Sequence, residues 1–453
     1  MEAMRLKALA TELGGRCQGD DARITGVAID SRAVRPGDLF IALPGARVDG
    51  HEFVAEAARA GAAAALVSHF VAADLPQWCV DDPRRLLVEL ACRVRSGSRA
   101  TVIGLTGSNG KTTVKEMIAA ILSRMGPTLA TAGNQNNELG VPLTLCRLEP
   151  THRFAVVEMG CGQPGDISLL ASWARPQIGL VNNAGPAHIA RFGSLEAIAR
   201  CKGELFEALP SGAQAVINAD DGFAAQWEQQ AAHCHILRFS LNGQPAEISG
   251  ELMPDGALRI RLPAGELTVR LLLPGAHNRA NALAASAVAH AAGADLTAIK
   301  AGLEAVQPMA GRLQSLPGIN GSEIIDDSYN ANPVSLQAAL EALTETSQPL
   351  WLVLGDMAEL GEDAAALHAE AGRRARAMGV ERLYALGPLA AQAAAAFGDS
   401  GRVYDDHAGL TAALQAAVTQ DVRVLIKGSR SAAMDQVVRA LVAPTSEGSA
   451  ACF

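Results

Sequence analysis

The stretch 102–113, with the sequence VIGLTGSNGKTT, constrains the fold of this chain more than any other. Residues 102–105 are apolar without a break, as in a buried strand, and apolar residues recur at helical spacing from Met117 to Leu122. A glycine-rich turn at 107–110 therefore separates a strand from the start of a helix. Glycine tolerates the dihedral angles that turn backbone N–H groups inward, and a helix N-terminus favours an anion. The stretch predicts a phosphate cradle and hence a nucleotide site.

Side chains within this turn have predicted roles. Lys111 would neutralise the β- and γ-phosphates, and the hydroxyl of Thr112 would ligate Mg²⁺. The common pattern G-x-x-x-x-G-K-[ST] is not strictly met, because position 105 is leucine. The alternative is a glycine turn with a surface lysine, which the flanking strand and helix disfavour. The predicted nucleotide-binding residues of the turn are Gly107, Ser108, Asn109, Gly110, Lys111, Thr112 and Thr113.

The whole chain has 453 residues, which is too long for one hydrophobic core. It is 49% hydrophobic but only 4% aromatic, so its cores must consist of Ala, Leu and Val, which suits α/β layers. A net charge of −9 argues against nucleic acid as a partner. We expect no membrane span and no signal peptide, and the eight scattered cysteines fit a cytoplasmic protein.

Strand and helix signals alternate along the chain and divide it into three expected domains. Residues 1–99 form a small α/β domain that ends in a linker at 96–98. Residues 100–312 form a central domain with a mostly parallel sheet, in which 236–273 reads as a small antiparallel sheet. Residues 313–453 form a Rossmann-like domain without G-x-G-x-x-G. The predicted fold class is therefore α/β with three domains.

Further chemistry-bearing side chains follow successive elements of the central domain. Glu158 ends one strand, His188 lies in a Gly/Pro loop after the next, and Lys202 lies on the following helix. Carboxyl ends of parallel strands face the ligand crevice, and a carboxylate near a phosphate loop usually holds Mg²⁺. We favour a ligand role over a structural role for His188, whereas the local pattern alone makes Lys202 a surface lysine. The missing N-K-x-D signature argues against a GTPase.

Several motifs resemble those of the Mur ligases, ATP-dependent amide-forming enzymes of peptidoglycan precursor synthesis, over essentially the whole chain. The resemblance rests on residues 106–113, 131–137, 157–160, 183–188, 202–204, 277–281, 311–312, 326–333 and 427–431. The motifs DSYNANP, LGDMAELG and KGSR resemble those of members that add D-alanyl-D-alanine to a UDP-N-acetylmuramoyl-tripeptide. The D-N-P-R motif of the diaminopimelate-adding members is not found.

The resemblance implies a division of labour among the domains. The N-terminal domain would hold the UDP-sugar, the central domain ATP and two Mg²⁺, and the C-terminal domain D-Ala-D-Ala. Lys202 would be carbamylated, because a carbamate offers hard oxygen ligands whereas an ammonium is repelled by Mg²⁺. The implied metal ligands are Thr112, Glu158, His188 and Lys202, and the implied catalytic residues are Lys111, Lys202, His188 and Glu158.

Implied binding residues complete this set. His277, Asn278 and Asn281 would flank the adenine, and Arg312 and Asp327 would reach the γ-phosphate and the ribose. The implied substrate-binding residues are Asp30, Ser31, Arg32, Asn134, Asn136, Asn137, Asn330 and Asn332. Without the resemblance, the turn formed by Asp30, Ser31 and Arg32 reads more simply as a solvated loop.

The implied reaction joins UDP-MurNAc-tripeptide and D-Ala-D-Ala through an acyl phosphate, with ADP and phosphate released, and we expect a monomer. Two alternatives stay open. One is another amide ligase of the same fold, such as a folylpolyglutamate synthase or a different Mur member. The other is an ATP-binding regulatory module, which would hydrolyse ATP slowly without any amine acceptor.

Overall fold

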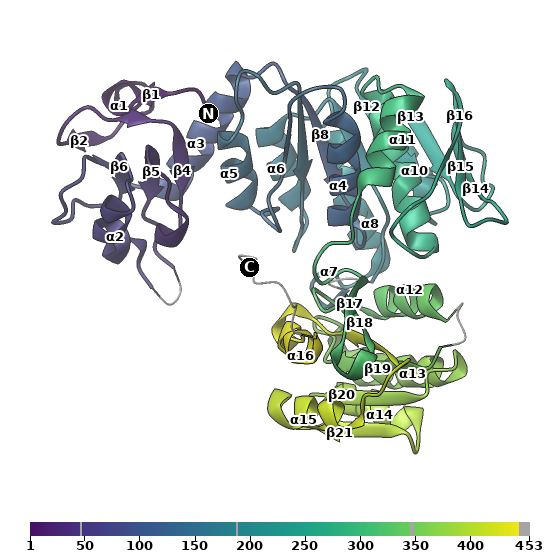
Figure 1. Ribbon diagram of the computed structural model, residues 1–453. Coiled ribbons are helices and arrows are strands. Elements are labelled where there is room, and N and C mark those ends of the chain that lie inside the picture. The colour runs from purple at the N-terminus through teal and green to yellow at the C-terminus, as the bar shows by residue number, and fades with distance from the viewer. Residues whose placement is uncertain (46–47, 187–188, 345–347, 444–453) are drawn as a thin grey trace.

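The computed structural model of the chain describes residues 1–45, 48–186, 189–344 and 348–443 (Figure 1). Three large sheets follow one another along the described chain, and each is covered by helices; two short strands near the N-terminus form a fourth, two-stranded sheet. In Figure 1 the first sheet lies at the left, the second at the top and the third below it. Within the described ranges no helix is both long enough and apolar enough to cross a membrane.

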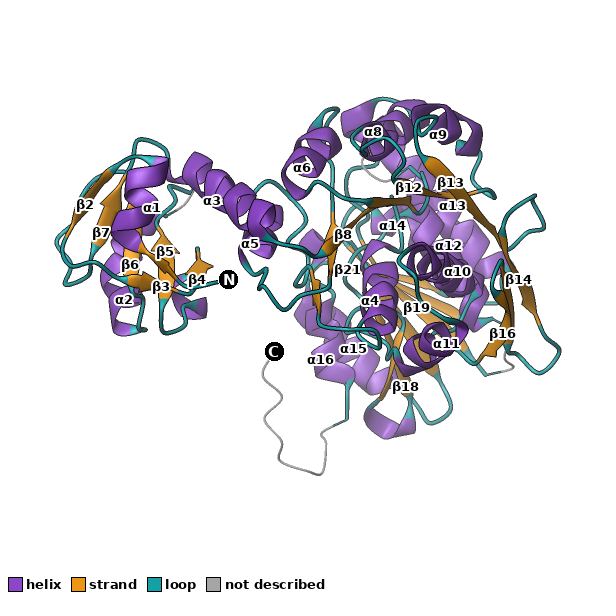
Figure 2. Cartoon of the chain, turned by 90° about the horizontal axis from the view of Figure 1, so that it is seen from above, coloured by secondary structure: helices purple, strands orange, loops and turns teal. Residues whose placement is uncertain are grey.

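The N-terminal sheet has the strand order β2-β7-β6-β5-β4 and stands apart from the rest of the molecule (Figure 2). The elements of this N-terminal unit are β1 (Met4–Arg5), α1 (Leu6–Leu13), β2 (Arg16–Gln18), β3 (Arg23–Ile24), β4 (Gly26–Ala28), β5 (Asp38–Ile41), α2 (Val54–Arg59), β6 (Ala64–Val67) and β7 (Gln77–Cys79). Strands β1 and β3 pair with each other in a separate two-stranded sheet. Strands β4 to β7 are parallel. The fully buried Trp78 of β7 donates from Nε1 to the carbonyl of Gly14 at 2.8 Å, which ties this inner strand to the end of α1.

Helix α3 (Pro83–Gly97) connects this sheet to the central domain. It begins with the Asp82 side chain as its N-cap and Pro83 in its first turn, both favourable at that place. The predicted linker at 96–98 is wrong in detail, because Ser96 and Gly97 are the last residues of α3. The buried Arg95 instead fastens the helix to the central domain, donating to the carbonyl of Ala174 at 2.7 Å.

The central sheet has the order β16-β15-β14-β13-β12-β11-β8-β10-β9. Its strands are β8 (Thr101–Thr106), β9 (Thr128–Ala130), β10 (Phe154–Glu158), β11 (Ile178–Val181), β12 (Gln214–Asn218), β13 (His235–Ser240), β14 (Ile248–Leu252), β15 (Leu258–Leu262) and β16 (Gly265–Val269). Strands β8 to β14 are parallel, and β14 to β16 antiparallel. The predicted small antiparallel sheet is therefore not separate: it extends the central sheet at one edge.

Helices cover both faces of the central sheet because successive side chains of a strand point to opposite sides. Val102 belongs to the core formed with α5, α6 and α8, whereas Ile103 and Leu105 belong to the core formed with α4, α10 and α11. The helices are α4 (Lys111–Leu122), α5 (Gly140–Cys146), α6 (Asp166–Ala174), α7 (Ile189–Phe192), α8 (Leu195–Glu207), α9 (Ala224–Gln230), α10 (Ala276–Ala291) and α11 (Leu296–Ala305).

The C-terminal sheet has the order β17-β18-β22-β19-β20-β21, and only β17 runs antiparallel to its neighbour. Its elements are β17 (Gln314–Pro317), β18 (Glu323–Asp327), α12 (Pro333–Leu343), β19 (Leu350–Gly355), α13 (Ala364–Ala377), β20 (Arg382–Leu386), α14 (Ala390–Phe397), β21 (Gly401–Tyr404), α15 (His407–Ala417), β22 (Arg423–Lys427) and α16 (Asp435–Leu441). Asp327 and Lys427 are register partners at the carboxyl ends of β18 and β22. Both residues line a cavity shared with the central domain.

Candidate active site

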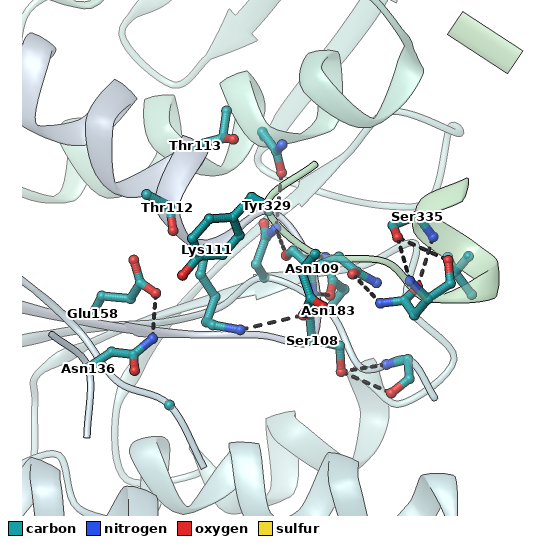
Figure 3. Close-up of a pocket in the computed structure, with 18 of the residues that line it drawn as sticks. Ser108, Asn109, Lys111, Thr112, Thr113, Asn136, Glu158, Asn183, Tyr329 and Ser335 are labelled. Atoms are coloured by element: carbon teal, nitrogen blue, oxygen red, sulfur yellow. Dashed lines mark hydrogen bonds between the residues drawn. The ribbon is translucent and has the colours of Figure 1, made fainter. Parts of the chain in front are cut away.

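A cavity of about 980 Å³ lies between the central and C-terminal domains. Its wall contains most of the residues that the sequence predicts for a site. These are Ser108, Asn109, Gly110, Lys111, Thr112, Thr113, Asn134, Asn136, Asn137, Glu158, Lys202, His277, Asn278, Asn281, Arg312, Asp327, Asn330 and Asn332. Figure 3 shows how side chains from β10, α4 and the segment after β18 converge there.

The glycine turn takes the form that its sequence predicts. Gly110 has φ +78° and directly precedes α4, and a Cβ atom at this position would lie 2.5 Å from Oδ1 of Asn281. The amide of Asn182 donates to the same oxygen at 3.0 Å, and Asn281 in turn donates to Asn278 at 3.2 Å. Side chains of α10 thus pack directly against the turn, and only glycine fits at position 110.

The side chain of Lys111 folds back over the glycine turn, at which we expect the phosphate to bind. Its Nζ donates to the carbonyls of Gly107 at 2.7 Å and Ser108 at 3.4 Å. Burial lowers the pKa of Lys111 to about 8, and the nearby ammonium of Lys202 acts in the same direction. A bound polyphosphate would relieve both effects, because it would supply the negative charge that a buried ammonium needs.

A second loop, following β11, braces the glycine turn. Asn183 accepts from the backbone N–H of Asn109 at 2.9 Å and donates to its carbonyl at 3.0 Å. The hydroxyl of Ser108 donates to the carbonyl of Gly185 at 3.0 Å. Asn183 was not among the predicted site residues, although its place at the end of a strand beside the turn was a usable signal. His188, predicted as a metal ligand, lies outside the described residues.

Glu158 is buried at the carboxyl end of β10 and offers a free ligand atom. Its Oε1 accepts from the amide of Asn136 at 2.8 Å, whereas the buried Oε2 has no hydrogen-bond partner among the described residues. A buried carboxylate oxygen without a donor fits a cation. No group of three or more His, Cys, Asp and Glu side chains that could hold a metal gathers in the described part of the chain. Mg²⁺ here would therefore need other oxygens, such as the hydroxyl of Thr112.

Lys115, which was not among the predicted site residues, contacts Glu158 indirectly, through Thr131. It is fully buried on α4, and its Nζ donates to the carbonyl of Thr131 at 2.7 Å and forms an ion pair with Glu116 at 3.0 Å. The hydroxyl of Thr131 accepts from the N–H of Glu158 at 3.0 Å. Lys115 thereby fixes the start of the loop that carries Asn136.

We expect Lys115→Met to lower the free energy of unfolding by about 1–3 kcal/mol, because the carbonyl of Thr131 loses a buried donor. The loop that carries Asn136 should shift away from Glu158, so half-maximal turnover should need more Mg²⁺. Urea unfolding and a Mg²⁺ titration of activity measure the two effects.

Lys300→Met is the matched control for this substitution. Lys300 is half exposed and pairs with Glu304 one helical turn away, so its loss should change stability by less than about 1 kcal/mol. If Lys115→Met resembled this control in stability and in Mg²⁺ dependence, the positioning role of Lys115 would be wrong.

Lys202 differs from the surface lysine that its local pattern suggests. Its residue is only 3% exposed, and Nζ donates to Sγ of Cys161 at 3.7 Å. The thiol is a weaker acceptor than the backbone carbonyl that receives the buried ammonium of Lys115. The sequence signal for this burial was the helical spacing of Ile198, Lys202 and Leu205, which places Lys202 on the buried face of α8.

The start of α10 forms one wall of the cavity. Burial lowers the pKa of His277 to about 4, and the positive charges of Lys427 and Arg279 act in the same direction. The imidazole is therefore neutral near pH 7 and can stack or hydrogen-bond without the cost of a buried charge. Asn278 donates to the carbonyl of Pro274 at 2.8 Å, which holds the first turn of the helix in place.

The C-terminal domain contributes charged groups to the opposite wall. Arg312 donates to the hydroxyl of Thr112 at 3.0 Å, and its guanidinium lies 4.3 Å from the ring centre of Tyr329. Lys427 pairs with Asp327 at 2.5 Å. Burial raises the pKa of Asp327, and Lys427 opposes that shift. Tyr329 and Lys427 stood in the predicted motifs without an assigned role.

The two asparagines of the DSYNANP motif both make local hydrogen bonds. Asn332 caps α12 by accepting from the N–H of Ser335 at 2.8 Å, and its amide donates to Oδ1 of Asn109 at 2.8 Å. Asn330 accepts from the N–H of Ala331 at 2.9 Å. Asn332 therefore also stabilises the turn and the contact between the domains.

The predicted UDP-sugar residues Asp30, Ser31 and Arg32 are not part of this cavity. They lie in the N-terminal unit, where Arg32 pairs with Asp30 at 2.7 Å and is largely exposed. Gly107 does not line the cavity either, although its carbonyl accepts from Lys111. In this arrangement of the domains the structure thus keeps the two predicted substrate regions apart (Figure 1).

Three family models match successive parts of the chain. The Mur ligase family, catalytic domain, matches residues 23–95, the Mur ligase middle domain residues 105–289, and the Mur ligase, glutamate ligase domain, residues 311–430. The UDP-N-acetylmuramoyl-tripeptide–D-alanyl-D-alanine ligase of Escherichia coli K12 is 42% identical over 447 residues, which is 97% of this chain and 99% of that protein.

Solved structures agree with the sequence comparison. A crystal structure of MurF from Acinetobacter baumannii has a TM-score of 0.87 and 33% identity, covering 97% of this chain and 98% of that one. The MurF ligase of Thermotoga maritima, solved in complex with ADP, has a TM-score of 0.77 and 28% identity, covering 92% and 96%. The family models together match most of the sequence and a relative is 42% identical, so the chain belongs to the Mur ligase family.

Proposed function

We propose that this chain is the ATP-dependent ligase that joins D-alanyl-D-alanine to UDP-N-acetylmuramoyl-tripeptide. The observation that carries this is the single cavity in which the phosphate turn of one domain faces the DSYNANP segment of another. The 42% identity to the E. coli ligase over nearly the whole chain supports the same reaction. An amide ligase needs such an arrangement, because ATP, the acyl donor and the amine must meet in one space.

The reaction begins by activating a carboxylate, which is a poor acyl donor because its anion is stable. Transfer of the γ-phosphoryl group of ATP to the tripeptide carboxylate gives an acyl phosphate with a good leaving group. The N–H groups of the glycine turn and Lys111 would hold the phosphates during this step. Arg312, now bonded to Thr112, could move to the γ-phosphate without leaving the cavity.

The amine of D-Ala-D-Ala then attacks the acyl carbon, and phosphate leaves as the tetrahedral oxyanion collapses to an amide. Lys111 contacts the turn and Arg312 contacts Thr112, and these two cations would stabilise charge in both steps. Water would hydrolyse an acyl phosphate, so we propose that the domains close further around the substrates.

Mg²⁺ would add charge neutralisation at the phosphates when bound. We propose Thr112 and Glu158 as ligands of a first ion, which the unpartnered Oε2 of Glu158 supports. Glu158, His188 and a carbamylated Lys202 would hold a second ion, and the burial of Lys202 supports that modification. We further propose that Asp30, Ser31 and Arg32 bind the UDP-sugar, and that the enzyme is a cytoplasmic monomer.

The test is a phosphate-release assay with UDP-MurNAc-tripeptide and MgATP, run with and without D-Ala-D-Ala. We expect release that depends on both co-substrates, together with formation of the pentapeptide nucleotide. Slow ATP hydrolysis that ignores both would favour a regulatory ATP-binding module instead. Turnover with folate and glutamate, but not with the tripeptide, would favour a folylpolyglutamate synthase.

Asn330→Ala should lower kcat/KM for D-Ala-D-Ala by the equivalent of about 1–3 kcal/mol if its side chain binds the internal amide of the acceptor. An asparagine side chain offers both a donor and an acceptor, as an amide requires. Asn332→Ala should have a similar effect on kcat/KM and also lower stability by about 1 kcal/mol, because the N-cap of α12 is lost.

Kinetics with D-Ala-D-Ala and with single D-Ala, alongside thermal unfolding, separate these effects. The acceptor assignment would be overturned if D-Ala served as well as the dipeptide. It would also be overturned if the Asn330→Ala variant matched the wild type. A loss of stability without any change in kcat/KM in Asn332→Ala would leave that residue with a purely structural role.

A further inference from the structure

Two cysteines at the cavity, Cys161 in its wall and Cys201 on the neighbouring helix α8, have no role in the mechanism above. Cys161 lies in the loop between β10 and α6, is half-buried and lines the cavity. Cys201 lies on α8 and is 1% exposed. Both are free thiols. The Sγ of Cys161 lies 3.7 Å from Nζ of Lys202, the residue after Cys201, and the Sγ of Cys201 lies 3.4 Å from the carbonyl oxygen of Gln163, two residues after Cys161. The fold thus brings two cysteines that are forty positions apart close together, beside the proposed Mg²⁺ ligand Lys202.

The loop that carries Cys161 is anchored at several points. The N–H of Gly160 donates to the carbonyl of Asn136 at 2.7 Å. The N–H of Gly165 donates to Glu204 of α8 at 2.8 Å, and the thiol of Cys201 donates to the carbonyl of Gln163 at 3.4 Å. These contacts hold the loop against α8, so the two cysteines stay close to each other. Such pre-organisation strongly favours an intramolecular reaction over one between separate thiols.

We propose that Cys161 and Cys201 are a redox modification site, at which hydrogen peroxide produces a disulfide that reversibly inactivates the enzyme. The cavity-lining Cys161 sulfur attacks one peroxide oxygen, the O–O bond breaks, and the thiol proton leaves in the first water. The sulfur of Cys201 then attacks the resulting sulfenic sulfur, and the S–O bond breaks. The released hydroxide takes the second thiol proton, so two thiols and one peroxide give one disulfide and two waters.

The disulfide would act on the reaction through Lys202. The two sulfurs must approach to about 2 Å, which moves the loop and α8 relative to each other. Lys202 directly follows Cys201, and its Nζ contacts Sγ of Cys161 at 3.7 Å, so the bond changes both its backbone and its neighbour. This effect on turnover rests on the proposed function, whereas formation of the bond does not.

The experiment treats the purified full-length protein with hydrogen peroxide, then blocks the remaining thiols and maps its peptides by mass spectrometry. We expect a linked pair of peptides containing Cys161 and Cys201. Turnover should fall by at least about tenfold, because small displacements of catalytic groups are costly. Dithiothreitol should restore the activity and separate the peptides.

Cys201→Ala is the decisive variant, with Cys201→Ser as a replacement if it folds poorly. Its untreated turnover should equal that of the wild type. After peroxide treatment it should form no disulfide with Cys161, so dithiothreitol should not produce the recovery of turnover that it produces in the wild type. Cys234→Ser removes a half-buried thiol elsewhere and should retain the wild-type response. The proposal is overturned if no linked peptide forms, if the linked enzyme keeps its turnover, or if Cys201→Ala loses and regains activity as the wild type does. Lack of turnover before treatment would instead contradict the proposed function, and the peptide map would still report on the disulfide.

Discussion

Lys111→Ala is expected to lower kcat by at least about two orders of magnitude, the usual cost of losing a pre-organised group that stabilises transition-state charge. Lys111 follows the left-handed Gly110 at the start of α4, and its Nζ lies within the turn, 2.7 Å from the carbonyl of Gly107. Its pKa is lowered to about 8 mainly by burial, so phosphate binding gains from restoring a stable ammonium. Initial rates of phosphate release at saturating substrates measure the effect.

A structural loss must be distinguished from a chemical one in this variant. The alanine also removes the donor to the carbonyls of Gly107 and Ser108, so the variant's thermal unfolding and ADP affinity should be measured beside its rate. Lys300→Ala, an exposed lysine on α11, is the matched control and should keep wild-type turnover. A folded Lys111→Ala enzyme with near-normal kcat would show that the turn is not the phosphate site.

The glycine turn could be predicted from the sequence because its signals are local. The apolar run at 102–105 became β8, and the helical spacing after Lys111 became α4. A strand, a turn and a helix of adjacent residues need no distant partner to be recognised. The α/β class and its three domains could likewise be predicted, because strand and helix signals alternate along the chain.

Contacts between distant segments could not be derived from local pattern. Arg312 and Thr112 are 200 positions apart, and Asn332 and Asn109 are 223 apart, yet both pairs join the domains across the cavity. The residues of such a pair carry no signal of each other in a single sequence. The antiparallel strands β14 to β16 were predicted as strands, but whether they join the central sheet depends on the pairing of β13 with β14.

The burial of charged side chains was the second feature that could not be predicted from the sequence. Lys115 and Lys202 both lie on amphipathic helices, where a lysine is normally assigned to the solvent face. Lys115 is buried because carbonyls of the loop after β9 receive its ammonium. Lys202 lies among the residues of the cavity, next to Cys161. The helical spacing around Lys202 indicated a buried face, but the groups that contact each ammonium come from other elements, and only the folded chain reveals them.

Lys202→Ala should fold and lose turnover by at least about two orders of magnitude if the lysine is a carbamate that holds Mg²⁺. An unmodified Lys202 adds repulsion at Lys111 and has a thiol as a hydrogen-bond partner. A carbamate would reverse the first effect and supply anionic oxygens beside Glu158, where Oε2 is unpartnered among the described residues. Carbamylation would therefore remove the repulsion between Lys202 and Lys111 and would provide oxygen ligands for a cation beside Glu158.

Rescue experiments separate a carbamate from an ammonium in that role. Acetate or formate can enter the space left by Lys202→Ala and should restore part of the turnover, whereas methylammonium should not. Lys202→Arg keeps a positive charge but cannot be carbamylated, so it should be as inactive as the alanine variant. Activity in Lys202→Arg, or rescue by the amine alone, would contradict the carbamate. Mass analysis of the intact protein under CO₂ provides a direct check. The wild type should gain one CO₂ adduct more than the Lys202→Arg variant does.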